Sequence, residues 1–154
     1  MNQISIIPYS SDLRHHFESI NKEWVKKYFT IEPFDIAQLE DPDKHIIKRG
    51  GAILFAKEGE EIIGTIGLVE TDEKETYELI KMGVLPKAQG RGVAKLLIQG
   101  IINEAKNKGV KKIILYSSSK LSPALSLYKK VGFKEVIKEC GKYARCDIKM
   151  EMAI

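Results

Sequence analysis

The sequence predicts a single α/β (α+β) domain, residues 1–154, in which about four helices flank a central mixed, mostly antiparallel sheet of about seven strands. Three apolar segments at 51–57, 62–69 and 77–84 follow one another with polar turns between them, as expected for an antiparallel meander. A glycine-containing loop then leads into a long amphipathic helix. The next segment, 112–117, is apolar on both faces, so this helix is expected to connect two parallel strands.

Composition and charge limit the classes of function. The chain is 44% hydrophobic and 30% charged, as in globular domains. It has no apolar run of the roughly 20 residues that a membrane span requires, and no apolar signal-peptide region at its N-terminus, so we expect a cytoplasmic protein without membrane contact. A net charge of +4 favours an anionic partner. Nucleic acid is the competing partner, but the lysines are spread out and no nucleic-acid motif accompanies them, so none is expected.

Neither a metal site nor a functional disulfide is expected. Cys140 and Cys146 have no C-x-x-C or His-rich context, and a reducing cytosol disfavours a bond between them. His15, His16 and His45 are not spaced as ligands, so we interpret them as solvated surface residues.

The first part of the chain is expected to form a strand at 3–8 and then a helix from Ser10 or Ser11. The helix carries an apolar stripe formed by Leu13, Phe17, Ile20, Trp24 and Tyr28. Such a stripe usually belongs to the core. Trp24 and Tyr28 are alternatively candidates to line a substrate pocket.

An acidic region follows at 30–45, where two prolines and five acidic residues predict a short helix between loops. Two interpretations of Glu32 and Asp35 are open. They form an acidic wall that attracts a cationic amine, or they cap and solvate the helix, which is the commoner role of such residues.

The stretch 78–94 organises the rest of the chain. A strand is expected to end before Pro86 and a helix to begin near Val93, with Gly90 and Gly92 between them. Glycines let backbone N–H groups approach a ligand, and the first N–H groups of a helix lack internal partners at the positive end of its dipole. The stretch therefore predicts a phosphate or diphosphate site, although it matches neither the P-loop nor the G-x-G-x-x-G pattern.

The elements after this loop complete the sheet. The long helix is expected to end at Gly109, and the strand at 112–117 to follow it. A short helix then begins at Ser119 or Ser122. Residues 133–139 and 146–152 are expected to pair as a closing hairpin.

Short motifs occur in a fixed order around the loop. They are Val84-Leu85-Pro86, then Gln89-Gly90-Arg91-Gly92-Val93-Ala94 in the pattern Q/R-x-x-G-x-G/A, then Leu127-Tyr128, and then Gly132-Phe133. From Ile53 to Phe133 the chain resembles the GNAT superfamily of acyl-CoA-dependent N-acyltransferases, whose loop of this form holds the coenzyme A pyrophosphate. The resemblance implies a GNAT-like fold whose sheet is splayed between its fourth and fifth strands.

The resemblance also implies acetyl-CoA as the acyl donor and no metal. The diphosphate would be bound by the backbone N–H groups of the loop residues Gln89, Gly90, Arg91, Gly92, Val93 and Ala94. Arg91, Lys87 or Lys95 would supply counter-charges. Unpaired backbone groups at Met82, Gly83 and Val84 would hydrogen-bond to the pantetheine amides.

Two residues are candidates for the chemistry of acetyl transfer to an amine. Tyr128 matches the family tyrosine that protonates the leaving thiolate, and its alternative role is an aromatic packed on the inner face of its helix. Glu78 stands where some members carry a base glutamate, and alternation would place it on the same face as Ile80 and Met82. A carboxyl among apolar neighbours would have a raised pKa suited to accepting a proton. A glutamate without catalytic duty is the alternative.

The sequence departs from the family at one position. Many members carry a coenzyme-contacting Asn where this chain has Leu121, so either Ser119 replaces that contact or it is absent. We expect an N-acetyltransferase acting on a primary amine of a small molecule or peptide. A non-catalytic acyl-CoA sensor of the same fold is the alternative. The acceptor is not predicted, and a homodimer is left open.

Overall fold

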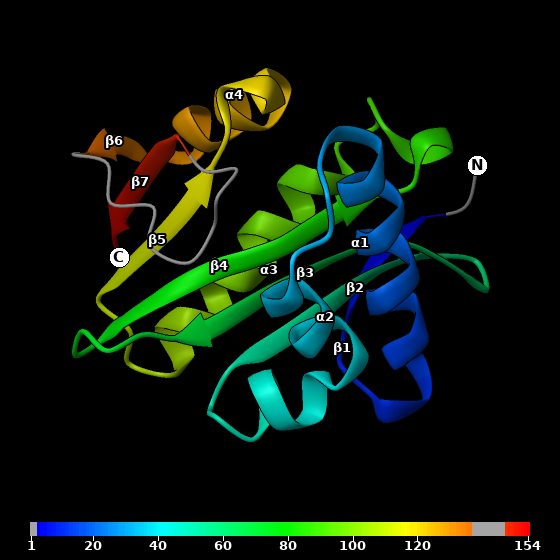
Figure 1. Cartoon of the computed structure of the whole chain (residues 1–154), viewed down its shortest axis with the longest axis horizontal. Coiled ribbons are helices and arrows are strands. Elements are labelled where there is room, and N and C mark those ends of the chain that lie inside the picture. The colour runs from blue at the N-terminus through cyan, green and yellow to red at the C-terminus, as the bar shows by residue number, and fades with distance from the viewer. Residues whose placement is uncertain (1–2, 137–146) are drawn as a thin grey trace.

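A computed structural model of the chain describes residues 3–136 and 147–154 (Figure 1). The described strands form a seven-stranded sheet in the order β1-β2-β3-β4-β5-β7-β6. They are β1 (Ile4–Pro8), β2 (Ala52–Glu58), β3 (Glu61–Glu70), β4 (Thr76–Val84), β5 (Lys112–Ser117), β6 (Lys134–Val136) and β7 (Ile148–Ala153). Among these described strands only β4 and β5 pair in parallel, so the predicted mixed, mostly antiparallel sheet is confirmed.

Four α-helices cover the two faces of this sheet in the part of the chain that the structure describes. They are α1 (Arg14–Tyr28), α2 (Pro33–Glu40), α3 (Val93–Asn107) and α4 (Ser122–Val131). One core joins α3 and α4 to the sheet through residues such as Leu97, Ile101 and Tyr128. A second core on the opposite face joins α1 and α2 to the sheet through Phe17 and Leu39. The sheet is therefore buried on both sides, which explains the long apolar runs of its central strands.

The elements follow the predicted order along the chain. A short 3₁₀ turn at Ser11–Leu13 leads into α1, and the Ser10 hydroxyl accepts the Asp12 N–H at its start, as the Ser10 cap predicted. The polar residues before Glu61 form the expected hairpin between β2 and β3. Strands β6 and β7 pair, as expected for 133–139 and 146–152, and residues 137–139 and 146 of this prediction lie outside the described residues. Cys140 and Cys146, for which no functional disulfide was expected, lie outside the described residues.

No helix among the described residues is long and apolar enough to cross a membrane. Within residues 3–136 and 147–154, no group of three or more His, Cys, Asp or Glu side chains is arranged to hold a metal ion.

Candidate functional site

The central strands β4 and β5 separate part of the way along their length. They pair only from Thr76 and Lys112 to Glu78 and Ile114. Beyond Glu78, β4 is paired with β3 on one side, and its other edge has no strand partner in the described chain. Because the strands diverge there, they leave a cavity of about 710 Å3 between them.

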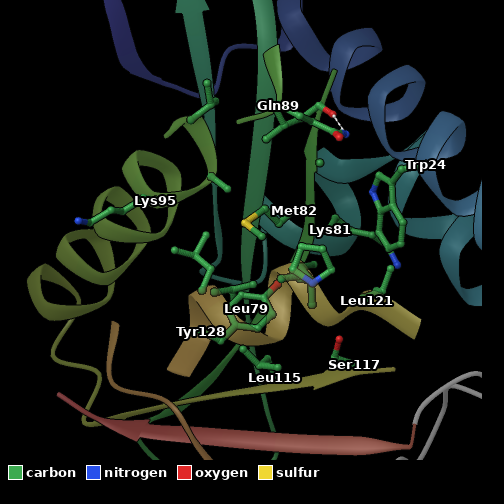
Figure 2. A pocket seen from close by; sticks show the side chains of 18 of the residues that line it. Trp24, Leu79, Lys81, Met82, Gln89, Lys95, Leu115, Ser117, Leu121 and Tyr128 are labelled. Carbon is green, nitrogen blue, oxygen red and sulfur yellow. Dashed lines mark hydrogen bonds between the residues drawn. The ribbon is translucent and has the colours of Figure 1, made fainter. Parts of the chain in front are cut away.

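Several elements converge on this cavity (Figure 2). In the view of Figure 2, Trp24 and Leu121 lie on one side, Lys95 on the opposite side, Gln89 at the top and Tyr128 at the bottom. The cavity thus runs from the loop that precedes α3, along the open edge of β4, to α4. This brings together the predicted diphosphate loop and the predicted catalytic tyrosine.

The N-terminus of α3 forms one end of the cavity. Gly90 and Gly92 have φ angles of +78° and +81°, in the left-handed region that glycine adopts without strain. A Cβ atom built on either residue would meet no atom within 4 Å, so the space above them is open. The N-cap residue Gly92 has no side chain, and the first N–H groups of α3 find no acceptor among the described residues. This end of the cavity therefore suits an anion.

The three predicted counter-charges, Lys87, Arg91 and Lys95, lie at different positions relative to the cavity. Arg91 does not line the cavity, because its guanidinium forms a two-pronged ion pair with Glu58 at the end of β2. Lys87 pairs with Glu61 near the start of β3. Of these three cations, only Lys95 lines the cavity.

The ion pair between Arg91 and Glu58 shifts the pKa of both groups. The hydrogen bond to Arg91 holds the pKa of the Glu58 carboxyl below its ordinary value. The same bond raises the pKa of Arg91. In this structure, Arg91 therefore fixes the loop to the sheet.

A β-bulge in β4 shapes the cavity wall. Thr65 pairs with Gly83 and Gly67 with Ile80, so β4 has one more residue than β3 across this interval. Lys81 within it adopts a φ of +52°, which is uncommon for a residue with a side chain.

The bulge overturns the predicted alternation. Ile80 packs with the core under α1 and α2, whereas Met82 packs with the core under α3. The expectation that Glu78, Ile80 and Met82 share one face was therefore wrong for Met82. The extra residue shifts the side-chain period by one position. Met82, Gly83 and Val84 all line the cavity, as do Gln89 and Ala94 farther along the chain.

Tyr128 lies on α4 and lines the cavity while only 7% of its surface is exposed. Its ring packs edge-on against Phe133, with centroids 5.8 Å apart. Its phenol forms no hydrogen bond with a described residue, and Figure 2 shows it pointing into the cavity. Burial raises the pKa of Tyr128, because a phenolate would be poorly solvated there, so the hydroxyl remains a proton donor at neutral pH.

Glu78 stands at the base of the gap. It is the last residue of β4 that pairs with β5, and it lines the cavity while 2% exposed. A carboxylate at this position is shielded from bulk water and reaches the same cavity as Tyr128.

Ser119, the predicted substitute for the coenzyme-contacting asparagine of the family, lies outside the cavity. The N–H and hydroxyl of Ser119 donate to the carboxylate of Asp147, at 2.8 Å and 2.7 Å. Ser119 does not line the cavity, whereas Ser118 and Leu121 do. The hydroxyl of Ser118 accepts the Lys120 N–H at 3.2 Å and caps the short 3₁₀ turn Ser119–Leu121.

In the acidic segment 30–45, the side chain of Asp35 does not belong to an exposed acidic wall. This side chain is fully buried, pairs with Lys81 of the β4 bulge, and accepts the Glu32 N–H at 3.0 Å. The structure thus supports the helix-capping interpretation for Asp35. Sequence reasoning missed Lys81, because nothing near it in the sequence marks a bulge.

Aromatic side chains form the wall of the cavity opposite α3. Trp24 packs directly on Gly83, where an added Cβ would lie only 2.8 Å from the ring. Its indole N–H donates to the side-chain oxygen of Asn21 at 2.8 Å. Tyr28, four residues later in α1, is 44% exposed. Trp24 and Tyr28 both line the cavity, which agrees with the interpretation that they line a pocket. Phe29 and Tyr116 also line it and were not predicted.

Comparisons with known proteins agree with this geometry. The family model described as "Acetyltransferase (GNAT) family" matches residues 14–133, which is most of the chain. No curated protein matches significantly.

Several solved structures share the fold. A GNAT-family acetyltransferase from Staphylococcus aureus Mu50 is 23% identical, with a TM-score of 0.87, 98% of this chain covered and 99% of that one. The PaiA N-acetyltransferase of Thermoplasma acidophilum in complex with coenzyme A is 22% identical, with a TM-score of 0.76 and 99% of each chain covered. A GNAT family acetyltransferase from Elizabethkingia anophelis with acetyl-CoA bound is 25% identical, with a TM-score of 0.67 and 100% of each chain covered. The family match and the shared fold together show that this chain belongs to the GNAT family of acetyltransferases.

Proposed function

We propose that the protein is an N-acetyltransferase that transfers the acetyl group of acetyl-CoA to a primary amine of a small molecule or peptide. One observation carries the proposal. A single cavity joins the open N-terminus of α3 to Tyr128 along the unpaired edge of β4. An acyl donor with a diphosphate at one end and a thioester at the other has the shape and charge that this cavity accepts.

The residues present fit coenzyme A. The unsatisfied N–H groups after Gly90 suit its diphosphate, and Lys95 adds a positive charge. The open edge of β4 at Met82, Gly83 and Val84 offers backbone groups to the amides of the pantetheine arm. When bound, acetyl-CoA supplies an acetyl group activated as a thioester.

The chain itself would then move two protons. A free amine has a pKa of about 10.4, so it must lose a proton before it attacks, and Glu78 would accept that proton directly or through water. A thiol has a pKa of about 8.5, and Tyr128 would donate its phenolic proton to the departing sulfur. Backbone N–H groups at Met82 or Val84 would polarise the carbonyl.

The second candidate is a non-catalytic acyl-CoA sensor, because a cofactor groove alone does not require turnover. Incubating the protein with acetyl-CoA and a panel of primary amines, while following free thiol, separates the two. Amine-dependent thiol release supports the enzyme. Saturable binding of acetyl-CoA without thiol release for any amine would overturn the enzyme and support the sensor.

A further inference from the structure

A second, more open cavity adjoins the first on its aromatic side. Its volume is about 580 Å3, and it shares Tyr28, Phe29 and Lys120 with the main cavity. It lies where the end of α1 faces the 3₁₀ turn Ser119–Leu121. Because the two cavities share these residues, the shared side chains form the mouth through which an acceptor amine would enter opposite the α3 loop.

The charges at this mouth are mostly positive. Lys26, Lys27 and Lys120 line it, together with the single acidic residue Glu32. All three lysines are exposed, and none forms a salt bridge with a described residue. The Lys120 ammonium lies 5.5 Å from the Phe29 ring centroid. This cation is therefore held at the mouth, and no carboxylate of the described residues forms a salt bridge with it.

Among the described residues, no exposed acid lines the main cavity to balance these lysines. Asp35 is buried and paired with Lys81, and Glu78 is 2% exposed. The exposed charged residues that line the main cavity are all lysines, namely Lys95, Lys120 and Lys130. An acceptor with a second ammonium group would be repelled at the mouth, whereas an acceptor with an anionic group would be attracted.

The wall between the mouth and the reacting groups is apolar. Trp24, Phe29 and Tyr116 line it, and they suit an aromatic or aliphatic body. We infer that the acceptor is a primary amine whose apolar body carries an anionic group, a carboxylate or a phosphate. This inference rests on the proposed acetyltransferase function. Lys120 binds the anionic group at the mouth while the amine points inward to Glu78.

Matched acceptors test this inference. Three acceptors differ only in the group para to the aminomethyl arm: a carboxylate in para-aminomethylbenzoate, a neutral amide in para-aminomethylbenzamide and a second ammonium in para-xylylenediamine. A phosphonate analogue distinguishes phosphate from carboxylate. We expect kcat/KM to favour the anionic acceptors over the diamine by about tenfold at low ionic strength, and the preference to shrink as salt is added. Equal or better turnover of the diamine would overturn the inference.

Charge-reversal variants locate the effect. Lys120→Glu should remove the preference for the anionic acceptors, whereas Lys74→Glu, an exposed lysine in the turn before β4, changes the net charge equally and should preserve it. Lys120 is the better residue to reverse, because Lys26 and Lys27 also stabilise the C-terminal end of α1, so reversing their charge would weaken the helix as well. An unchanged preference in Lys120→Glu would remove Lys120 from acceptor recognition.

A binding measurement keeps the inference separate from the proposed activity. Trp24 is the only tryptophan in the sequence, so its fluorescence reports ligands at the aromatic wall. Para-toluate, which has no amine, should quench it more strongly than para-toluamide, and Lys120→Glu should abolish the difference. If no acceptor is acetylated but this difference is seen, the proposed activity fails and the anion site stands. If the two ligands bind equally or not at all, the anion site fails.

Discussion

Lys81 and Asp35 form a buried ion pair that joins the β4 bulge to α2. The exposed fractions of their side chains are 3% and 0%. Lys81 adopts a left-handed conformation next to the cavity, and the Asp35 carboxylate also accepts the Glu32 N–H at the start of α2. The pair therefore ties the part of the cavity wall that β4 forms to α2.

Asp35→Asn should destabilise the protein by about 3 kcal/mol, because it leaves a buried ammonium without its counter-charge. The amide oxygen still accepts a hydrogen bond, so the helix cap is largely retained. Urea denaturation measures the change, and Asp72→Asn in an exposed turn is the control. The double variant Asp35→Leu with Lys81→Met should recover most of the loss. A single variant as stable as the control would show that the pair contributes little.

Gly92→Glu should abolish binding of coenzyme A, because it places bulk and negative charge where the diphosphate would lie. The change also forces a side chain into a left-handed conformation, so it needs a matched control. Gly109 has a φ of +79°, and a Cβ there would also meet nothing within 4 Å. Gly109→Glu therefore adds the same strain and charge at the other end of α3. Calorimetry should show lost binding only in the first variant, and retained binding there would contradict the placement of the diphosphate.

Tyr128→Phe should lower kcat by about a hundredfold and leave the affinity for coenzyme A nearly unchanged. The packing on Phe133 survives, since only the hydroxyl is removed. Burial raises the pKa of Tyr128, so the wild-type kcat should not fall through loss of this proton until the pH exceeds the ordinary tyrosine pKa of about 10. A pH profile of kcat checks this. Unchanged turnover in the variant would remove Tyr128 from the mechanism.

The parts of the site that depend on local motifs could be predicted from the sequence. The order of a glycine loop followed by a helix start predicted that Gly90 and Gly92 lie at the N-terminus of a long helix, where the structure has them, since these properties belong to consecutive residues. The order of strands followed from the turns between them. Tyr128 came from a motif whose resemblance to a known family located it, and the structure places it in the same cavity as the loop.

The parts that depend on distant contacts could not be predicted. Arg91 was one of three predicted counter-charges for the diphosphate, with Lys87 and Lys95, but it pairs with Glu58, which is 33 positions earlier in the chain. Alternation along β4 gave no sign of the bulge at Lys81, because a bulge appears only when two strands are compared. The two hydrogen bonds from Ser119 to Asp147 also join residues far apart in the sequence.

The ion pair between Arg91 and Glu58 gives a prediction about stability and pH. Glu58 has a lowered pKa in the folded protein, so the pair stabilises the fold above the ordinary glutamate pKa of about 4.3 and loses this effect as the pH falls through the lowered value. The difference in Tm between wild type and Glu58→Gln should therefore be constant near neutral pH and shrink in acid. Glu61→Gln breaks the more exposed pair with Lys87 and should change Tm little. A Tm difference that persists unchanged at low pH would show that charge pairing with Arg91 is not its source.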